Sequence, residues 1–480
     1  MKKIILIILV VLLALIAVVA LVLKGNPKQD IVREAYIYAY PLVTMDMTRR
    51  QLTNVEVADD AHAPMGQIIK MRSYPSVDNH VAAAPNAETL YTMVWYDLNN
   101  EPWVFTIPDM GDRFYIMPML SGNNEVFHVA GTRATGQKNQ TYVLTGPEWK
   151  GQLPEGLVEV KSPTSLVWIL GRVYCTGTDE DYEATHKLQD QFQSVPLSSY
   201  GKEYIPSKGI IDPNFDMKKG VRDQVNAMSL VDFFTYFSEL LKTNPPKPED
   251  AAIIAQMAEI GIVPGEDFDA GKLPKLGKKV DPKLALLEMV KVMKEKKTVN
   301  GWLYWNSNAG SYGKDYKQRA MVTLIGPGLN FPQDAVYPFS EKDANGKDYD
   351  GAKNYVIHFE KGKLPPVNGF WSITMYDKDF FFIKNDINRY NLSQLTNVEI
   401  ADEAHAPMGQ MINMRSYPSV DNHVAAAPNA ETLYTMVWYD LSKEPWVFTI
   451  PDMGDRFYIM PMLSGNNEVF NVAGSRATGQ

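Results

Sequence analysis

Cysteine is almost absent from this chain, and its scarcity limits the chemistry available. The 480 residues include one cysteine, Cys175, so no internal disulfide can form. Cys175 follows Val173 and Tyr174 in strand-like sequence, which favours a buried, unreactive thiol. There is no Cys-X-X-Cys pair, His-X-His or His-Glu-X-X-His spacing, nucleophile elbow, phosphate-binding glycine loop or dinucleotide fingerprint. We therefore expect no bound cofactor and no dedicated metal motif.

Blocks of basic residues are also lacking. The net charge is −9, from 47 Lys and Arg against 56 Asp and Glu, and the charges are spread along the chain. Proteins that bind nucleic acid normally carry a basic patch, so we exclude that class. The proportions of 45% hydrophobic and 21% charged residues are typical of two or three globular domains.

One long apolar run stands at the start of the chain. Ile4–Leu23 contains 20 consecutive apolar residues behind Lys2 and Lys3, which is enough to cross a bilayer as one helix. We interpret residues 1–24 as an uncleaved signal anchor, with a removed signal peptide as the alternative. Because the lysines favour a cytoplasmic start, we expect the body on the extracytoplasmic face of a bacterial membrane, in the periplasm or cell envelope.

Residues 51–137 occur a second time as residues 394–480, with 8 differences over 87 positions. Two distant copies do not make a repeat array, which usually needs about three units. The first copy continues past Gln137 into another strand-like run, whereas the second does not. We expect 395–480 to be a partial duplicate with uncovered strand edges, poorly integrated or independently packed. A misassembled reading frame and a true duplication are both consistent with the sequence.

The first copy and the residues after it have a strand pattern. Thr89–Leu98 alternates between two faces, and further short runs separated by turn signals follow it. These runs cover residues 103–107, 113–120, 125–130, 140–144, 158–160 and 165–173. The spacing predicts a β-sandwich or jelly roll over residues 25–178, preceded by a helix over 29–40 that Pro41 ends.

Residues 179–305 have a helical pattern. Helices are predicted over 179–195, 230–243, 248–260 and 282–296, several opening with proline or acidic residues. Strand patterns return at 321–324, 355–360, 370–377 and 380–383. They predict a second β-rich domain over 306–394, which the repeat cuts short. The expected fold class is α+β, with two sandwich-like or jelly-roll-like β-rich domains separated by a helical region and an N-terminal transmembrane or signal helix.

Several motifs, taken in order, resemble two bacterial families. Glu34–Leu42, Ala84–Tyr91 and Gly146–Gly151 resemble the family of unknown function numbered 1254, over residues about 30 to 195. Leu364–Asp377 resembles the family numbered 1214, over residues about 320 to 393. The resemblance implies two β-rich domains around helices and export for many members, and no established reaction. The loop Ser121–Asn124 departs from the family pattern, which usually has an acidic and an aromatic residue near it.

One stretch gathers side chains suited to a polar or carboxylated small molecule. Asn86, Thr89, Tyr91, Trp95 and Asp97 place amide, hydroxyl, phenol, indole and carboxylate groups along one strand face and the preceding turn. The alternative is that the two aromatics belong to the core and Asn86 only shapes the turn. The candidate ligand-binding residues are Asn86, Thr89, Tyr91, Trp95, Asp97, His128 and Arg133.

The histidines and arginines suggest two further kinds of site, a metal site and a carboxylate-binding site. A metal site would need about three ligands, which could come from His62, His80, His128, His358, Asp78 and Asp97. His128 equally fits a satisfied strand histidine between Phe127 and Val129. Arg113, Arg133 and Arg389 could bind a carboxylate through paired hydrogen bonds or could clamp turns as ion pairs.

These observations lead to three functional hypotheses. The first is an extracytoplasmic, membrane-anchored protein that holds a small polar or carboxylated ligand against the first β-rich domain. The second is a metal-assisted, hydrolase-like enzyme that uses His80, His128 and Asp97. The third is a structural or assembly module without pocket chemistry.

Overall fold

The computed structural model describes most of the chain up to residue 393 and short stretches beyond it. The described residues are 27–77, 85–275, 285, 298–299, 301–304, 308–353, 355–357, 359, 363–378, 380–385, 390–393, 411–413, 435–437, 450, 453, 458–464 and 469–474. The chain divides into two compact units, Met1–Asn391 and Leu392–Gln480.

Some expectations fall outside these residues. They are the apolar run Ile4–Leu23, most of the predicted helix 282–296, and the candidate residues Asp78, His80, His358 and Arg389. Within the described part of the chain, no helix has the length and apolar character needed to span a bilayer.

Two sheets form the body of the first unit. The larger sheet has the order β1-β2-β8-β4-β5 and the smaller one the order β7-β6-β3-β9. The strands are β1 (Ile69–Lys70), β2 (Thr89–Asp97), β3 (Trp103–Ile107), β4 (Tyr115–Ser121), β5 (Val126–Gly131), β6 (Gln140–Thr145), β7 (Val158–Lys161), β8 (Leu166–Tyr174) and β9 (Gln193–Pro196). All pairs in the larger sheet are antiparallel, while β6 and β7 run parallel. The strands predicted from the sequence in this region are present, with ends shifted by at most two residues.

The larger sheet is buried on both faces. Val94 and Tyr96 of β2 face the core shared with the smaller sheet, which includes Phe105 and Leu144. The alternate residues Met93 and Trp95 belong to a second core, which includes Met45 from the long N-terminal helix. The alternation predicted for Thr89–Leu98 is therefore real, but neither face of this strand is open to solvent along its length.

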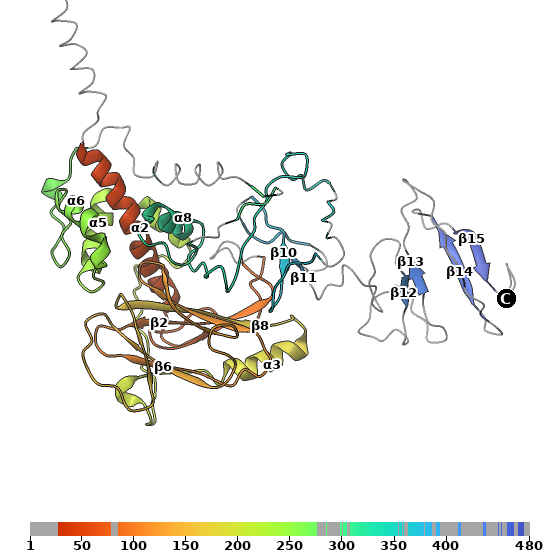
Figure 1. The fold of residues 1–480 in the computed structure, drawn as a ribbon, viewed down its shortest axis with the longest axis horizontal. Helices are drawn as coiled ribbons and strands as arrows, with labels where there is room; N and C mark the ends of the chain where they lie inside the picture. Colours follow the sequence, from red (N-terminus) through yellow and green to blue (C-terminus); the bar gives the residue numbers. More distant parts are fainter. Residues whose placement is uncertain are drawn as a thin grey trace, which may run out of the picture. The chain divides into compact units, whose positions relative to one another are not determined.

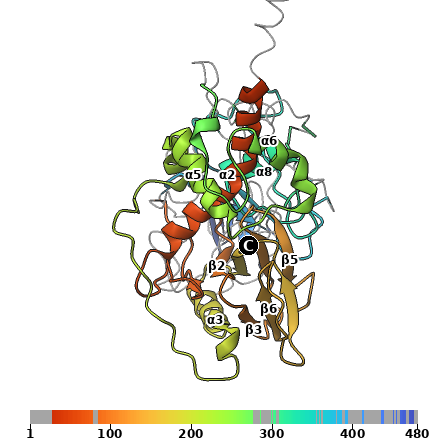
Figure 2. The same cartoon turned by 90° about the vertical axis from the view of Figure 1, so that its left-hand side faces the viewer.

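Helices form a layer beside the sheets. They are α2 (Pro27–Thr53), α3 (Asp179–Gln189), α4 (Val221–Ala227), α5 (Leu230–Leu241), α6 (Ala251–Ala258) and α8 (Tyr316–Ile325), with short 3-10 turns η1 (Leu197–Ser199), η2 (Pro248–Asp250) and η3 (Ala270–Lys272). Figures 1 and 2 show α2 running from the group formed by α5, α6 and α8 towards the sheets. Side chains of α2, α4, α5, α6 and α8 share one core, in which Phe233, Phe234 and Phe237 are fully buried. Residues from both ends of the first unit therefore build the helical layer.

The structure corrects the expected end of the first helix and the end of α3. Pro41 does not end the first helix, because α2 continues to Thr53 with Pro41 inside it. Burial of Leu42, Val43 and Met45 offsets the backbone hydrogen bond lost at the proline. The helix predicted over 179–195 ends at Gln189, and Gln193–Pro196 joins the smaller sheet as β9.

The predicted strand over 321–324 is wrong, because these residues lie in α8. Asp315 caps this helix by accepting a hydrogen bond from the Gln318 amide. Burial of Ala320, Met321 and Val322 outweighs the strand preference of the β-branched residues. Of the later strands, the described residues show β10 (Ser372–Thr374) paired with β11 (Asn391–Ser393), and an isolated bridge between Tyr376 and Phe382.

The second unit contains two short antiparallel pairs. β12 (Met411–Asn413) pairs with β13 (Thr435–Val437), and β14 (Ile459–Leu463) pairs with β15 (Val469–Gly474). Subtracting the 343-residue offset of the repeat maps these strands onto β1, β2, β4 and β5, with the same partners in the same register. Even the register shift after Met119 recurs after Met462.

Candidate functional site

The turn before β2 is organised by Asn86. Its Oδ1 accepts hydrogen bonds from the Thr89 amide and the Thr89 hydroxyl, each at 2.9 Å. These two contacts fix the orientation of the amide, so its Nδ2 donates to the Tyr91 hydroxyl at 2.9 Å. The structure thus brings Asn86, Thr89 and Tyr91 together.

Arg172 of β8 lies next to this cluster. It is the cross-strand neighbour of Tyr91, and its guanidinium carbon lies 5.5 Å from the centre of the Tyr91 ring. Burial lowers the pKa of Arg172, but the neighbouring phenols of Tyr337 and Tyr91 raise it more, so the net shift is upward. Arg172 is therefore a permanent cation between two phenols.

Arg172 lacks the acidic partner that nearly every other described arginine has. Ion pairs hold Arg33, Arg49, Arg50, Arg72, Arg113, Arg133 and Arg319. Among the arginines that the structure describes, only Arg172 and the exposed Arg222 form no ion pair with a carboxylate of a described residue. A half-buried guanidinium without a counter-charge is well suited to hold an anion from solution.

Each hydroxyl group beside Arg172 accepts a hydrogen bond from an asparagine side chain. Tyr91 accepts from Asn86, and Tyr337 accepts a 2.7 Å hydrogen bond from Asn330 Nδ2. Both phenol oxygens are also hydrogen-bond neighbours of the Arg172 guanidinium, and each hydroxyl retains its own hydrogen as a donor. Asn330 is 1% exposed, and its Oδ1 has no partner among the described residues. The arrangement offers one guanidinium and two hydroxyl donors to the same region.

Residues from the end of the first unit close around the Asn86 turn. The Tyr376 hydroxyl donates to the Pro85 carbonyl at 2.7 Å. Asn391 Nδ2 donates to the Ala87 carbonyl at 3.0 Å and to Glu88 Oε1 at 2.6 Å. The turn is thereby held from a segment about 300 residues away in sequence.

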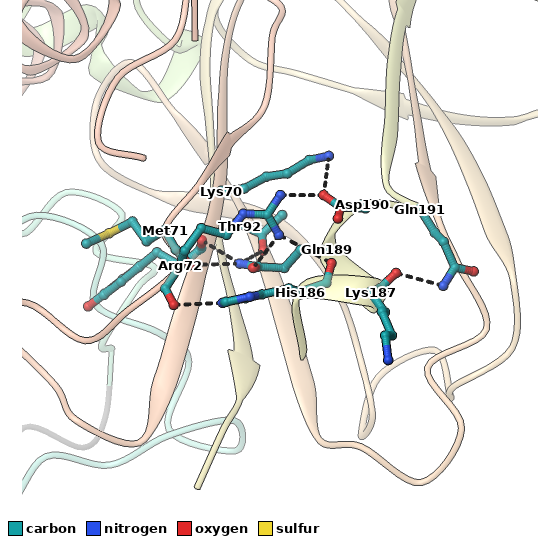
Figure 3. Close-up of polar contacts among 10 residues, drawn as sticks. Lys70, Met71, Arg72, Thr92, His186, Lys187, Gln189, Asp190 and Gln191 are labelled. Atoms are coloured by element: carbon teal, nitrogen blue, oxygen red, sulfur yellow. Dashed lines mark hydrogen bonds and ion pairs between the residues drawn. The ribbon is translucent and has the colours of Figure 1, made fainter. Parts of the chain in front are cut away.

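Helix α3 also supports this strand, through polar contacts around Gln189 and Asp190 (Figure 3). Gln189 Nε2 donates to the carbonyls of Met71 and Tyr91 and to the Thr92 hydroxyl, at 3.1 to 3.2 Å. Asp190, at the end of the helix, pairs with Lys70 and Arg72. Because Gln189 is fully buried, these bonds fix the backbone position of Tyr91.

The other candidate residues on β2 lie apart from this cluster. Trp95 is buried and stacked on Trp168, with ring centres 4.7 Å apart, so it is a core residue. Asp97 is exposed at the far end of β2, where it accepts hydrogen bonds from Asn99. Asp97 lies eight positions after Thr89 on this strand, a distance of about 26 Å at roughly 3.3 Å per residue.

His128 and Arg133 are also separate from the cluster. His128 lies on β5, which is separated from β2 by β8 and β4 in the sheet order. Its ring packs edge-on to Tyr142, and burial lowers the pKa of its imidazole. Arg133 forms a two-bond ion pair with the buried Asp334, at 2.6 and 3.0 Å. Arg133 thus matches the ion-pair alternative considered from the sequence, whereas His128 is not the satisfied strand histidine, because its buried Nε2 has no hydrogen-bond partner among the described residues.

No metal centre is found in the described part of the chain, where no three His, Cys, Asp or Glu side chains are grouped as ligands. His62 contacts Asp59, and Asp97 is remote from His128. Arg113 pairs with Asp181 at 2.6 Å and donates to the Tyr174 carbonyl, so it clamps α3 to the sheet. Cys175 is a buried free thiol, and burial raises its pKa.

The loop Ser121–Asn124 connects the sheet to α8. Asn124 has a φ of 58° and binds the Thr323 hydroxyl and the Gly328 amide through its side chain. The neighbouring Glu125 pairs with Lys247 at 2.6 Å and Arg319 at 3.5 Å. Arg319 is 1% exposed and lies between the rings of Tyr38 and Tyr316. This loop therefore joins the two layers.

Sequence reasoning missed Arg172, Asn330 and Tyr337. Arg172 stands in an otherwise apolar strand, and that interruption was the available signal. The pairing of β2 with β8, and the approach of residues 330–337, cannot be read from local periodicity.

Comparisons with known proteins agree with the order of motifs in the sequence. The chain matches the model of a protein of unknown function (DUF1254) over residues 65–196 and that of a protein of unknown function (DUF1214) over residues 334–458. The second match extends past residue 393 into the stretch that repeats residues 51–115. No curated protein matches the chain.

Among solved structures, the chain is similar to the crystal structure of the VPA0106 protein from Vibrio parahaemolyticus. The two are 22% identical, the match covers 78% of this chain and 86% of that chain, and the TM-score is 0.53. This likeness supports the mixed α+β fold with its β-rich sheets. The chain therefore carries a DUF1254 match followed by a DUF1214 match, in the order that its motifs indicated.

Proposed function

We propose that the chain binds a small carboxylated molecule at Arg172, between Tyr91 and Tyr337. The observation that carries the proposal is a half-buried guanidinium without a carboxylate partner, flanked by two hydroxyl groups that are free to donate. A carboxylate only accepts hydrogen bonds, so it complements three donors in a way that a neutral amide does not.

A thermal-shift panel tests this proposal. The probes are acetate, succinate, citrate and galacturonate, each compared with acetamide or the corresponding amide at the same ionic strength. A carboxylate present at about 100 times its dissociation constant should stabilise the protein by roughly 2.7 kcal/mol. The amides should have no effect.

Two matched variants locate the binding site. Arg172→Gln removes a charge-assisted interaction of about 1.5–3 kcal/mol, which should weaken carboxylate binding roughly 10- to 150-fold. Arg222→Gln removes the other arginine without an acidic partner and should leave binding unchanged. Equal binding by both variants, or no response to any carboxylate, would refute the proposal.

The protein's location is a second part of the proposal. Ile4–Leu23 would anchor the chain in a bacterial membrane, with the body on the extracytoplasmic side. The support is a run of 20 apolar residues behind two lysines. The full chain should sediment with membranes and resist extraction at alkaline pH. Recovery of a soluble chain beginning near Leu21 would show instead that the segment is a removed signal.

A further inference from the structure

The second unit repeats strands that have a common neighbour in the first unit. In the first unit β8 lies between β2 and β4, and it pairs antiparallel with both. β13 repeats part of β2, and β14 repeats part of β4. Residues 166–174, which form β8, occur once in the sequence. β13 and β14 thus repeat the two strands that pair with β8 in the first unit, but the repeat contains no copy of β8 itself.

Apolar residues of β14 and β15 are open, whereas their first-unit counterparts pack in a core that includes Trp168 of β8 and Met45 of α2. Ile459, Leu463 and Val469 are 56%, 50% and 57% exposed. Their counterparts Ile116, Leu120 and Val126 are 5%, 0% and 5% exposed. Apolar strand residues that are open to this extent mark a surface for another protein segment.

The first unit defines the register of the absent strand. Ile169 of β8 pairs with Val94 on one side and with Met119 on the other. The corresponding residues of the second unit are Val437 and Met462, which lie in β13 and β14. A strand with the β8 pattern, Leu166–Tyr174, therefore has a defined position between these two edges.

We propose that the second unit binds an extended apolar strand with the β8 pattern, supplied by another polypeptide, between β13 and β14. Such binding adds a strand to a sheet and displaces no strand pairing among the described residues of the second unit. In the first unit, β8 pairs with the edges of β2 and β4. We expect the second unit to present the same β4-type edge, because residues 116–127 and 459–470 are identical. Main-chain hydrogen bonds provide the attraction, and the apolar residues on both faces provide the preference for an apolar strand.

A labelled peptide tests the proposal on the full chain. The probe spans Pro163–Thr176 with Cys175→Ser, carries a solubilising lysine tail and is followed by fluorescence anisotropy. It should bind saturably at one site and protect the amides of 435–437 and 459–463 from hydrogen exchange. The same peptide with Ile169→Asp places a charge at the doubly paired position and should bind at least 10-fold more weakly.

Variants of the chain distinguish this site from other apolar surfaces. Met462→Asp in β14 should weaken peptide binding at least 10-fold. The matched Ile210→Asp, at a 91% exposed residue of the first unit, should not change it. Binding that persists after removal of residues 395–480, that is unchanged by Met462→Asp, or that is absent up to about 100 μM peptide would overturn the proposal.

Discussion

The two copies of the 87-residue sequence show the same local pairing and very different burial. β4–β5 and β14–β15 share their register, including the shift after Met119 and Met462. All residues of β4 are buried, whereas Ile459, Pro461 and Leu463 of β14 are exposed. Local sequence is therefore sufficient for the hairpin, but the sheet and its cores require segments outside the repeat.

Those outside segments are identifiable in the first unit. β8 joins β2 to β4, α2 supplies Met45 to the core over the larger sheet, and α8 binds the loop at Asn124. The loss of Lys70 in the second copy fits this account, because its partner Asp190 also lies outside the repeat. A residue whose ion-pair partner lies outside the repeat contributes less to the stability of the second copy, so its replacement there costs little.

The same comparison applies to the proposed binding site. Asn86, Thr89 and Tyr91 recur in the second copy as Asn429, Thr432 and Tyr434. Arg172, Asn330 and Tyr337 occur once, outside the repeat. Half of the site is thus duplicated, and the half that carries the charge is not.

The largest expected difference comes from equivalent leucines. Leu120→Ala removes a fully buried side chain and should lower the free energy of unfolding of the first unit by about 2–5 kcal/mol. Leu463→Ala, at the equivalent half-exposed position, should change stability by less than about 0.5 kcal/mol. Chemical denaturation of both variants, followed by tryptophan fluorescence, measures the contrast. Similar losses would show that the second copy is packed like the first.

An ion pair to a segment outside the repeat provides the next test. The hydrogen bond from Arg113 holds the pKa of Asp181 at about 2. Since the folded value lies below the unfolded value, this stability is present above pH 4 and is lost as the pH falls towards 2. Arg113→Gln should cost about 1–2 kcal/mol at pH 7, allowing for partial exposure, and should flatten the unfolding curve between pH 4 and 2. An unchanged acid profile would contradict the assignment.

A smaller effect is expected at the one difference between β5 and β15. Burial lowers the pKa of His128, so the folded state resists its protonation. Stability should therefore fall as the pH drops below the unfolded value of about 6.5, because the unfolded chain takes up the proton first. His128→Asn, which copies Asn471, should remove this dependence and change stability at pH 8 by less than about 1 kcal/mol. Urea denaturation of the original chain and of His128→Asn, each at pH 5.5 and at pH 8, measures this difference.

Removal of the second copy should have the smallest effect on the first unit. A chain ending at residue 394 retains β8, β11, α2, α8 and Arg172, so its unfolding midpoint and its carboxylate binding should match those of the full chain. Differential scanning calorimetry measures the midpoint. A cooperative loss of folding on deletion would make the repeat a structural part of the first unit.

Sequence patterns predicted the strands well because each pattern is local. Residues 103–107 formed the predicted strand, and Thr89–Asp97 alternates as expected. Patterns failed where distant packing decides the outcome, as in α8, whose β-branched residues suggested a strand. They also indicated the Asn86–Tyr91 half of the candidate site and missed Arg172, since the pairing of residues 91 and 172 depends on topology.

The most direct test of the account is the stoichiometry of carboxylate binding. Isothermal titration of the full chain, with the carboxylate that stabilises it most, should give one site per chain although Asn86–Tyr91 occurs twice. Arg172→Gln should weaken that site roughly 10- to 150-fold, while Arg222→Gln should leave it intact. Two equivalent sites, or one site of undiminished affinity in Arg172→Gln, would contradict the claim that the unpaired guanidinium of β8 creates the binding site.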